Sequence, residues 1–360
     1  MTDQKEMMIT KEAVIAALSG VIEPELHKDL ITLKMVEDIE VKGSEIFFKI
    51  ILTTPACPLV EKIKSDATKA VKAIEGVTAV SIVMDSRVAS DGQAREMLKL
   101  PIKNAVAIAS GKGGVGKSTV AVNVAVTLAT KGARVGLLDA DIYGPNIPTM
   151  MGVDGLPAPI NGRLIPAESY GVKMMSIGFM VAPGQPLIWR GPMLHTAIRQ
   201  FLADVEWGEL DYLIIDLPPG TGDAQLSLMQ NLPLSGGAIV TLPQLVSLED
   251  AGRGLQMFKE LKVPVLGVIE NMSYLAMPDG TKMDLFGTGG GQALAEKMDV
   301  PFLGCIPIDP EVRIGGDSGK PVSLTKPESE VAKALVSVTE RIAAQVSMMA
   351  FAQAQKEGDS

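Results

Sequence analysis

The chain has 360 residues, enough for two domains, and 47% of them are hydrophobic, enough for a large core. Its net charge of −9 argues against a broad nucleic-acid-binding surface. The polar first ten residues do not resemble a secretory signal, and no uncharged apolar run approaches the roughly 18 residues of a membrane span. The two distant cysteines, Cys57 and Cys305, fit a reducing compartment rather than a disulfide framework. The sequence therefore predicts a cytoplasmic protein that binds neither nucleic acid nor membrane.

Residues 1–88 predict a small α+β domain. The pattern runs helix, strand, strand, helix, strand over residues 10–19, 36–41, 45–53, 59–75 and 77–84. Thr10 is placed to cap the first helix, and Gly43 lies in the turn between the first two strands. The charged and polar stretch 89–103 predicts a linker to the rest of the chain.

Cys57 lies in the stretch Thr53-Thr-Pro-Ala-Cys-Pro58, between a predicted strand and a predicted helix. Together with Glu23-Pro-Glu-Leu26, this stretch resembles a small domain associated with iron–sulfur assembly, in which D-P-E-L is the usual form of the second motif. A helix dipole at such a position lowers the pKa of a thiol from about 8.5 and favours a thiolate, which could serve as an iron–sulfur ligand. The alternative interpretation, that Cys57 is simply a small, half-buried loop residue, is equally good, because a lone cysteine supplies only one ligand per chain.

Residues 111–119 predict a phosphate-binding loop. They fit G-x-x-x-x-G-K-[ST] and lie between a short apolar run at 105–109 and a helical pattern at 120–131. The loop consists of Gly111, Lys112, Gly113, Gly114, Val115, Gly116, Lys117, Ser118 and Thr119. Its backbone N–H groups suit phosphate oxygens, Lys117 suits the β- and γ-phosphates, and the Ser118 hydroxyl suits magnesium. The sequence therefore predicts that the chain binds a nucleoside triphosphate together with Mg²⁺.

Lys112 adds a second lysine directly after the first glycine of this loop. This form resembles the deviant Walker A loop shared by MinD, ParA, the nitrogenase iron protein and Mrp-type ATPases. In that class the extra lysine crosses a dimer interface and touches the partner's nucleotide. The resemblance implies a homodimer that holds ATP between its subunits, with Lys112 and Lys117 both serving hydrolysis.

The rest of residues 104–350 predicts an α/β fold with a doubly wound, mostly parallel sheet. Apolar strands at 134–139, 211–216, 237–242, 265–270 and 301–306 alternate with helical patterns at 193–204, 223–231, 247–261 and 292–298. A helical stripe at 331–349 predicts core or dimer packing, and 351–360 predicts a flexible tail. Such a sheet binds its ligand at the carboxyl ends of the strands, where the glycine loop also falls.

Acidic residues follow two strands at that edge. The stretch Leu137-Leu-Asp-Ala-Asp141 resembles the first switch of the deviant class, which implies that Asp141 orients or deprotonates the attacking water. Asp139 then supports either the magnesium shell or the switch. Asp216 ends an apolar strand in a Walker B pattern and would hold magnesium through water. Gly220, four residues on, could bring a backbone N–H to the γ-phosphate.

The stretch Glu270-Asn-Met272 ends another predicted strand and resembles the base-recognition segment of these ATPases. Asn271 offers both a donor and an acceptor, which is the pair needed to recognise an adenine edge. An asparagine after a strand is also an ordinary turn residue, so this alternative stays open. Pro307 and Asp309 are further candidates for the surroundings of the base.

Taken together, residues 1–350 resemble the Mrp/ApbC family of iron–sulfur cluster carrier ATPases. Further matching stretches are Trp189-Arg-Gly-Pro192, Asp216-Leu-Pro-Pro-Gly-Thr-Gly-Asp223 and Phe286-Gly-Thr-Gly-Gly290. The resemblance implies ATP hydrolysis, delivery of clusters to apo client proteins or assembly factors, and a cluster held at the dimer interface by a Cys-x-x-Cys pair from each subunit. In this chain the positions of that pair hold Met277 and Gly280, which cannot replace iron-binding thiolates. The usual cluster ligands are therefore absent.

Two kinds of function follow from these motifs. The first is an ATP-hydrolysing homodimer that binds iron–sulfur clusters and transfers them to apoproteins. The alternative is an ATP-dependent regulatory or positioning switch without a cluster, which the missing cysteine pair favours. The acidic charge and the absence of a basic terminal helix argue against the DNA and membrane surfaces that positioning ATPases use. Cys305, inside an apolar strand, predicts inert core packing.

Overall fold

The structure is a computed structural model that describes residues 9–92, 101–142, 144–180, 200–222, 225–226, 228–229, 233–277 and 279–358. The chain separates into two compact units, Met1–Ala89 and Ser90–Ser360. Each unit has its own hydrophobic core. The predicted helices at 193–204 and 223–231 lie largely outside the described residues, as does the stretch 189–192.

The first unit is the small α+β domain predicted from the sequence. Its elements are α1 (Lys11–Leu18), β1 (Ile22–Glu23), β2 (Lys28–Asp29), β3 (Val36–Lys42), β4 (Glu45–Leu52), α2 (Val60–Lys72) and β5 (Ala79–Ser86). The side chain of Thr10 caps α1 by accepting a hydrogen bond from the N–H of Ala13. Strand β4 pairs antiparallel with β3 and parallel with β5. Residues such as Phe48 and Ile63 fill the core between this sheet and the helices.

The second unit is built on a nine-stranded sheet, counted over the described residues. Its strands are β6 (Ile102–Ser110), β7 (Val135–Asp139), β8 (Ala167–Ser169), β9 (Val172–Ser176), β10 (Leu210–Asp216), β11 (Gly236–Thr241), β12 (Val265–Ala276), β13 (Lys282–Met283) and β14 (Phe302–Ile308). The order is β13-β12-β11-β6-β10-β7-β9-β8, and β14 pairs with β12. Only β8 and β13 pair antiparallel within this described sheet, so the predicted mostly parallel architecture is confirmed.

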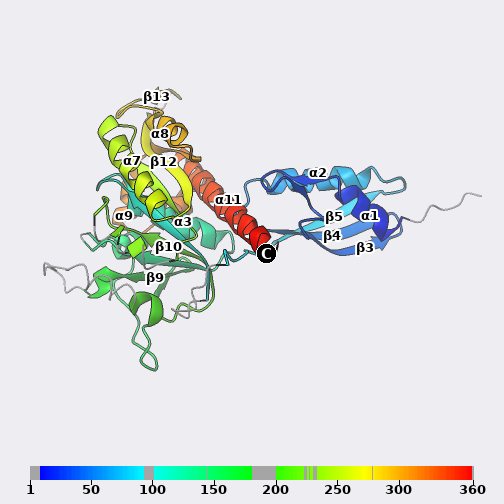
Figure 1. Ribbon diagram of the computed structural model, residues 1–360, viewed down its shortest axis with the longest axis horizontal. Helices are drawn as coiled ribbons and strands as arrows, with labels where there is room; N and C mark the ends of the chain where they lie inside the picture. Colours follow the sequence, from blue (N-terminus) through cyan, green and yellow to red (C-terminus); the bar gives the residue numbers. More distant parts are fainter. Residues whose placement is uncertain are drawn as a thin grey trace, which may run out of the picture. The chain divides into compact units, whose positions relative to one another are not determined.

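Helices cover both faces of this sheet (Figure 1). They are α3 (Lys117–Thr130), α4 (Ile147–Met151), α7 (Leu245–Glu260), α8 (Gly290–Met298), α9 (Pro310–Asp317), α10 (Val322–Thr325) and α11 (Glu330–Gly358), with a 3₁₀ turn at Ile177–Met180. Helices α7 and α8 pack on one another and on β11 and β12, whereas α11 packs on α3 and β14. Strand β6 is apolar along its length because both faces of the sheet are covered. Ala105, Ala107 and Ala109 belong to the same core as Phe258 of α7, and the residues between them are also buried.

Three of the element boundaries that differ from the prediction change an interpretation of the sequence. Strand β6 begins at Ile102, inside the predicted linker, because Ile102 pairs with Leu210 and Lys103 bonds Asp211 at 2.9 Å. Strand β12 does not end at Glu270 but continues to Ala276 through an irregularity at Met272, which has a φ of +53°. Helix α11 continues to Gly358, beyond the predicted start of the tail at 351, because alanine, glutamine, lysine and glutamate all favour helix.

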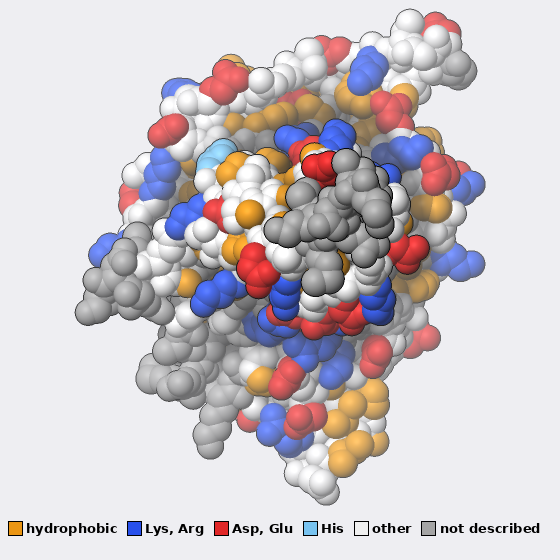
Figure 2. Space-filling view, turned by 90° about the vertical axis from the view of Figure 1, so that its right-hand side faces the viewer, with side chains coloured by type: hydrophobic (Ala, Val, Ile, Leu, Met, Phe, Trp, Pro, Cys, Tyr) orange, Lys and Arg blue, Asp and Glu red, His pale blue; other side chains and the backbone are white. Residues whose placement is uncertain are grey.

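Charged side chains of both signs are interspersed over the face seen in Figure 2, without a region of one sign. Among the described residues, no helix is both long and apolar enough to cross a bilayer.

Candidate nucleotide site

The glycine loop joins the end of β6 to the start of α3, as its sequence predicts. Gly114 and Gly116 adopt φ values of +81° and +85°, in the left-handed region that favours glycine. A loop of this kind turns successive N–H groups toward a common centre and leads into the positive end of a helix. A Cβ added at Gly114 would meet nothing within 4 Å, so the loop is open on that side. The backbone is therefore suited to receive phosphate oxygens.

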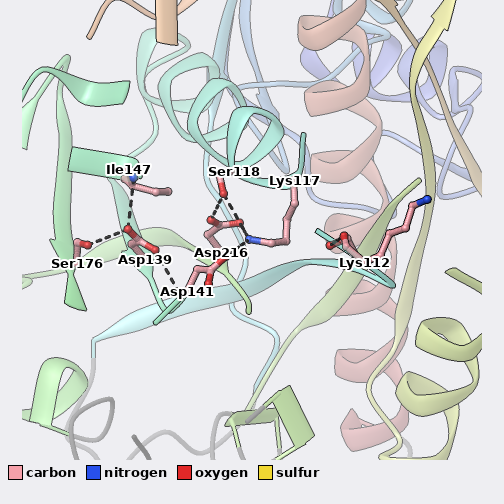
Figure 3. Close-up of polar contacts among 9 residues, drawn as sticks. Lys112, Lys117, Ser118, Asp139, Asp141, Ile147, Ser176 and Asp216 are labelled. Atoms are coloured by element: carbon pink, nitrogen blue, oxygen red, sulfur yellow. Dashed lines mark hydrogen bonds and ion pairs between the residues drawn. The ribbon is translucent and has the colours of Figure 1, made fainter. Parts of the chain in front are cut away.

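Lys117, Ser118 and Asp216 form the centre of the site (Figure 3). The Lys117 ammonium donates to Asp216 Oδ1 at 2.7 Å, and the Ser118 hydroxyl donates to Asp216 Oδ2 at 2.6 Å. Lys117 is only 5% exposed and Asp216 is fully buried, so each charge depends on the other for compensation. Burial raises the pKa of Asp216, while the neighbouring Lys117 ammonium opposes that rise.

These oxygen donors fit a magnesium nucleotide. Magnesium in phosphate sites is usually held by one or two protein oxygens together with phosphates and water. Ser118 and Asp216 supply such oxygens next to the phosphate-binding loop. Among the described residues, no group of three or more His, Cys, Asp or Glu side chains is placed to hold a metal ion alone. The phosphates of a nucleotide would therefore complete the shell.

Asp141 also lies near the Lys117 ammonium, with its Oδ2 at 3.7 Å from Nζ. The residue is buried, with 8% of its surface exposed. Asp216 and Asp141 thus both face Lys117, and Asp216 also bonds Ser118. This division agrees with separate roles for the two acids.

Asp139 is fully buried at the end of β7 and holds the chain that follows it. Its carboxylate accepts hydrogen bonds from the Ser176 hydroxyl at 2.8 Å, the Asp141 N–H at 3.2 Å and the Ile147 N–H at 3.4 Å. Burial, followed by the nearby charge of Asp216, raises the pKa of Asp139 to about 8. These contacts favour the role of supporting the switch over that of supporting magnesium.

Lys112 and Gly220 make contacts other than those predicted for the bound state. Figure 3 shows the Lys112 side chain directed away from Lys117 and the acids, and its ammonium has no ion pair with another described residue. Its carbonyl accepts a hydrogen bond from the Ser110 hydroxyl. The Gly220 N–H donates to the Ser110 carbonyl at 3.0 Å, so it would have to exchange this bond before reaching a γ-phosphate.

A cavity of about 730 Å³ adjoins the glycine loop at Gly116. Asn271, Pro307 and Asp309, all predicted near the base, line it together. Asn271 lies within β12 rather than after it, and its amide donates to the Val115 carbonyl at 2.8 Å. The structure thus brings the predicted base residues to one hollow beside the phosphate loop.

Several residues of the site escaped the sequence prediction. Asn146 and Thr149 of the α4 region line the cavity, and Ser176 at the end of β9 bonds Asp139. Ser176 carried a usable signal, because it is a polar residue at the carboxyl end of an apolar stretch, as Asp139 is. Asn146 and Thr149 had no such signal, since only the packing of α4 beside α9 brings them to the cavity.

The two cysteines lie apart from this centre. Cys57 is buried in the core of the first unit, three residues before α2, where its sulfur accepts from the Leu59 N–H at 3.4 Å. Cys305 is half-buried in β14 rather than packed among apolar groups alone, because its thiol lies 3.8 Å from Glu270 Oε1. Burial raises the pKa of Cys305. Both cysteines belong to the described chain and neither forms a disulfide.

The positions predicted for the cysteine pair lie in the turn between β12 and β13. The Gly280 N–H donates to the Met277 carbonyl at 2.9 Å, so the two positions close one tight turn. Gly280 has a φ of +82°. The turn brings the two positions near each other, but their side chains offer no thiolate.

Comparisons with known proteins cover both units. A family model described as "NUBPL iron-transfer P-loop NTPase" matches residues 101–343, and one described as "Iron-sulfur cluster assembly protein" matches residues 11–82. The iron-sulfur cluster carrier protein of Synechocystis sp. is 51% identical over 352 residues, which cover 96% of this chain and 100% of the relative. The protein of the same name from Deinococcus radiodurans is 50% identical over 341 residues, covering 94% of this chain and 96% of the relative.

Solved structures resemble the second unit. A nucleotide-binding protein from Archaeoglobus fulgidus in complex with ADP has a TM-score of 0.55 and 40% identity, covering 64% of this chain and 92% of its own. The cell division ATPase MinD of Pyrococcus furiosus has a TM-score of 0.52 and 26% identity, covering 66% and 98%. These similarities agree with the sheet order and with a nucleotide site at the carboxyl ends of its strands.

Proposed function

Because this chain belongs to the family of NUBPL iron-transfer P-loop NTPases, we propose that it hydrolyses magnesium-ATP and transfers iron–sulfur clusters to apoproteins. The observation that carries the proposal is a complete set of phosphate-site residues in a chain that matches cluster carrier proteins over nearly its whole length. We further propose apo iron–sulfur proteins or assembly factors as partners. The two cysteines, neither of which forms a disulfide, fit the reducing cytoplasm in which we propose that it works.

The proposed roles in hydrolysis follow from the contacts around Lys117. Magnesium, when bound with ATP, neutralises phosphate charge in the transition state. Lys117, now bonded to Asp216, would bind the β- and γ-phosphates, and Ser118 and Asp216 would supply oxygens to the metal. Asp141, 3.7 Å from the Lys117 ammonium, would orient the attacking water. Asp139 keeps the backbone of Asp141 in place.

We propose a homodimer as the hydrolysing form, with Lys112 reaching the partner's nucleotide. The direction of the Lys112 side chain, away from its own Lys117, supports this proposal (Figure 3). Lys112→Ala should therefore bind ATP with the parent affinity, fail to dimerise with a non-hydrolysable ATP analogue and lose most of its turnover. Analytical ultracentrifugation with and without the analogue measures the first effect. Normal dimerisation together with normal turnover would count against a shared site.

The cluster is cargo in this proposal. Met277 and Gly280 stand where the family resemblance implies cysteines, so Cys57 is the proposed ligand. The same substitution favours a second candidate function, an ATP-dependent regulatory switch without a cluster. In that case the nucleotide site would act, but no iron would be carried.

Anaerobic reconstitution with iron and sulfide separates these two functions. The proposed carrier should take up iron and show the absorbance of a cluster, and Cys57→Ala should lose most of both. Cys305→Ala is the matched control, because it removes the other thiol, and it should keep the parent iron content. Absence of iron uptake by the parent would reject the carrier and favour the switch. Equal uptake by both variants would reject Cys57 as the ligand but leave the carrier function standing.

A further inference from the structure

Glu270 is a fully buried carboxylate that has no role in the proposed hydrolysis. It lies in β12 directly before Asn271. A buried carboxylate is costly unless polar groups compensate its charge, so its partners indicate why the fold keeps it. Glu270 is not among the described residues that line the base cavity. Its influence on a nucleotide must therefore act through a neighbour.

Besides the Cys305 thiol, which lies 3.8 Å from Oε1, Glu270 bonds backbone N–H groups at the start of α8. Oε1 accepts from the Gly289 N–H at 3.3 Å and Oε2 accepts from the Gly291 N–H at 2.5 Å. The first turn of a helix offers free N–H groups and a positive dipole end, both of which favour a carboxylate. The contact leaves no room for a side chain at Gly291, where an added Cβ would lie 2.8 Å from Glu270 Cβ. Glu270 is thus clamped tightly to α8.

The clamp sits one residue before the last regular pair of β12 ahead of its irregular part. Glu270 pairs with Cys305 and Asn271 with Ile306, and the register to β14 then shifts between Asn271 and Leu275. Met272, within that shift, has a φ of +53°. Successive side chains of a strand point to opposite faces, so Glu270 is held on the α8 side while Asn271 projects to the cavity beside Gly116. Fixing one residue therefore fixes the direction of the next.

We propose that Glu270 is a positioning residue for base selection, which holds β12 against α8 so that the Asn271 amide meets the nucleotide base. The inference rests on the proposed function, because it takes Asn271 as the group that recognises the base. It adds that recognition depends on a carboxylate on the opposite face of the sheet. The selectivity for an adenine over a guanine nucleotide is then set partly by the Glu270 contact with Gly289 and Gly291.

The test is the ratio of the dissociation constants of GTP and ATP, each measured with magnesium by calorimetric titration. Glu270→Gln keeps the size of the side chain but removes the charge and points an amide N–H at backbone N–H groups. The buried N–H groups of Gly289 and Gly291 would then lack a good acceptor. The ratio of the GTP dissociation constant to the ATP dissociation constant should therefore fall by about 10-fold, mainly through weaker ATP binding. A merely structural role would weaken both nucleotides alike and leave the ratio unchanged. Asn271→Ala should lower the ratio at least as far.

Asp284→Asn is the matched control. Asp284 is exposed and accepts from the Gly287 N–H at 2.5 Å, so this variant removes a carboxylate from the same glycine segment without touching β12. It should keep the parent ratio. If Glu270→Gln keeps the parent ratio while Asn271→Ala lowers it, the positioning role is overturned and the base role of Asn271 stands. If Asn271→Ala also keeps the parent ratio, the base assignment itself fails.

Gly291→Ala keeps the proposal testable if Glu270→Gln does not fold. The added methyl group would displace Glu270 without removing its charge. The ratio should again fall, and hydrogen exchange at the N–H groups of residues 289 and 291 should accelerate. A folded Gly291→Ala variant with the parent ratio would overturn the proposal.

Discussion

Replacing Lys117 by alanine is expected to weaken magnesium-ATP binding by at least about 100-fold, because each hydrogen bond to a charged group contributes roughly 1.5–3 kcal/mol. This ammonium also compensates two acids, at 2.7 Å from Asp216 and 3.7 Å from Asp141. The variant would therefore present two uncompensated carboxylates to an incoming polyphosphate. Calorimetric titration with magnesium-ATP measures the loss.

Lys131→Ala is the matched control for this experiment. Lys131 follows the last residue of the same helix, α3, and pairs with Glu340 at 2.9 Å, far along the helix from the loop. Its loss should leave ATP affinity unchanged. Circular dichroism should establish that both variants are folded before the titrations are compared. ATP affinity of Lys117→Ala within a few-fold of the parent would reject the phosphate assignment.

Asp141→Asn is expected to retain ATP binding and to lower turnover by about 10²-fold, within the range of general acid–base catalysis. Asparagine keeps the shape of the side chain and can still accept one hydrogen bond, but it removes the charge that orients or deprotonates water. The backbone of residue 141 should stay in place, since Asp139 holds its N–H. Steady-state phosphate release, with affinity measured separately, checks the prediction.

Two further variants serve as comparisons for the turnover of Asp141→Asn. Asp216→Asn should instead weaken the magnesium dependence of binding, because Asp216 bonds Ser118 as well as Lys117. Asp154→Asn, at an exposed position further along the same stretch, should change neither quantity. Parent turnover in Asp141→Asn would assign the hydrolytic role to another residue.

The phosphate half of the site was predictable because each of its parts is local in the sequence. The glycine loop, Asp141 and Asp216 each follow an apolar run, and parallel strands bring such positions to one edge of the sheet. The sequence therefore predicts that Lys117, Ser118 and Asp216 lie together. It does not indicate the hydrogen bond that the lysine donates to the aspartate.

The base half was less predictable because its geometry depends on irregular backbone and distant packing. Met272 has no feature that marks a positive φ, so β12 was expected to stop where it only changes register. Glu270 accepts hydrogen bonds from the N–H groups of Gly289 and Gly291, and a backbone group leaves no trace in a side-chain pattern. The sequence places the end of α11 too early for a different reason. The apolar stripe ends at 349, but residues with high helix propensity extend the helix to Gly358.

The carboxylate of Asp139 has a consequence for the order of events in a nucleotide cycle. It holds the N–H groups of Asp141 and Ile147, so these two positions are tied to one point. One of them belongs to the residue proposed to face the γ-phosphate, and the other begins α4, whose Thr149 lines the base cavity. Under the proposed function, a movement of the Asp139 carboxylate would thus reach both ends of a bound nucleotide. Thermodynamic reciprocity would then make the γ-phosphate and the base change each other's affinity by the same factor. Loss of the terminal phosphate would accordingly change the affinity of the protein for the base.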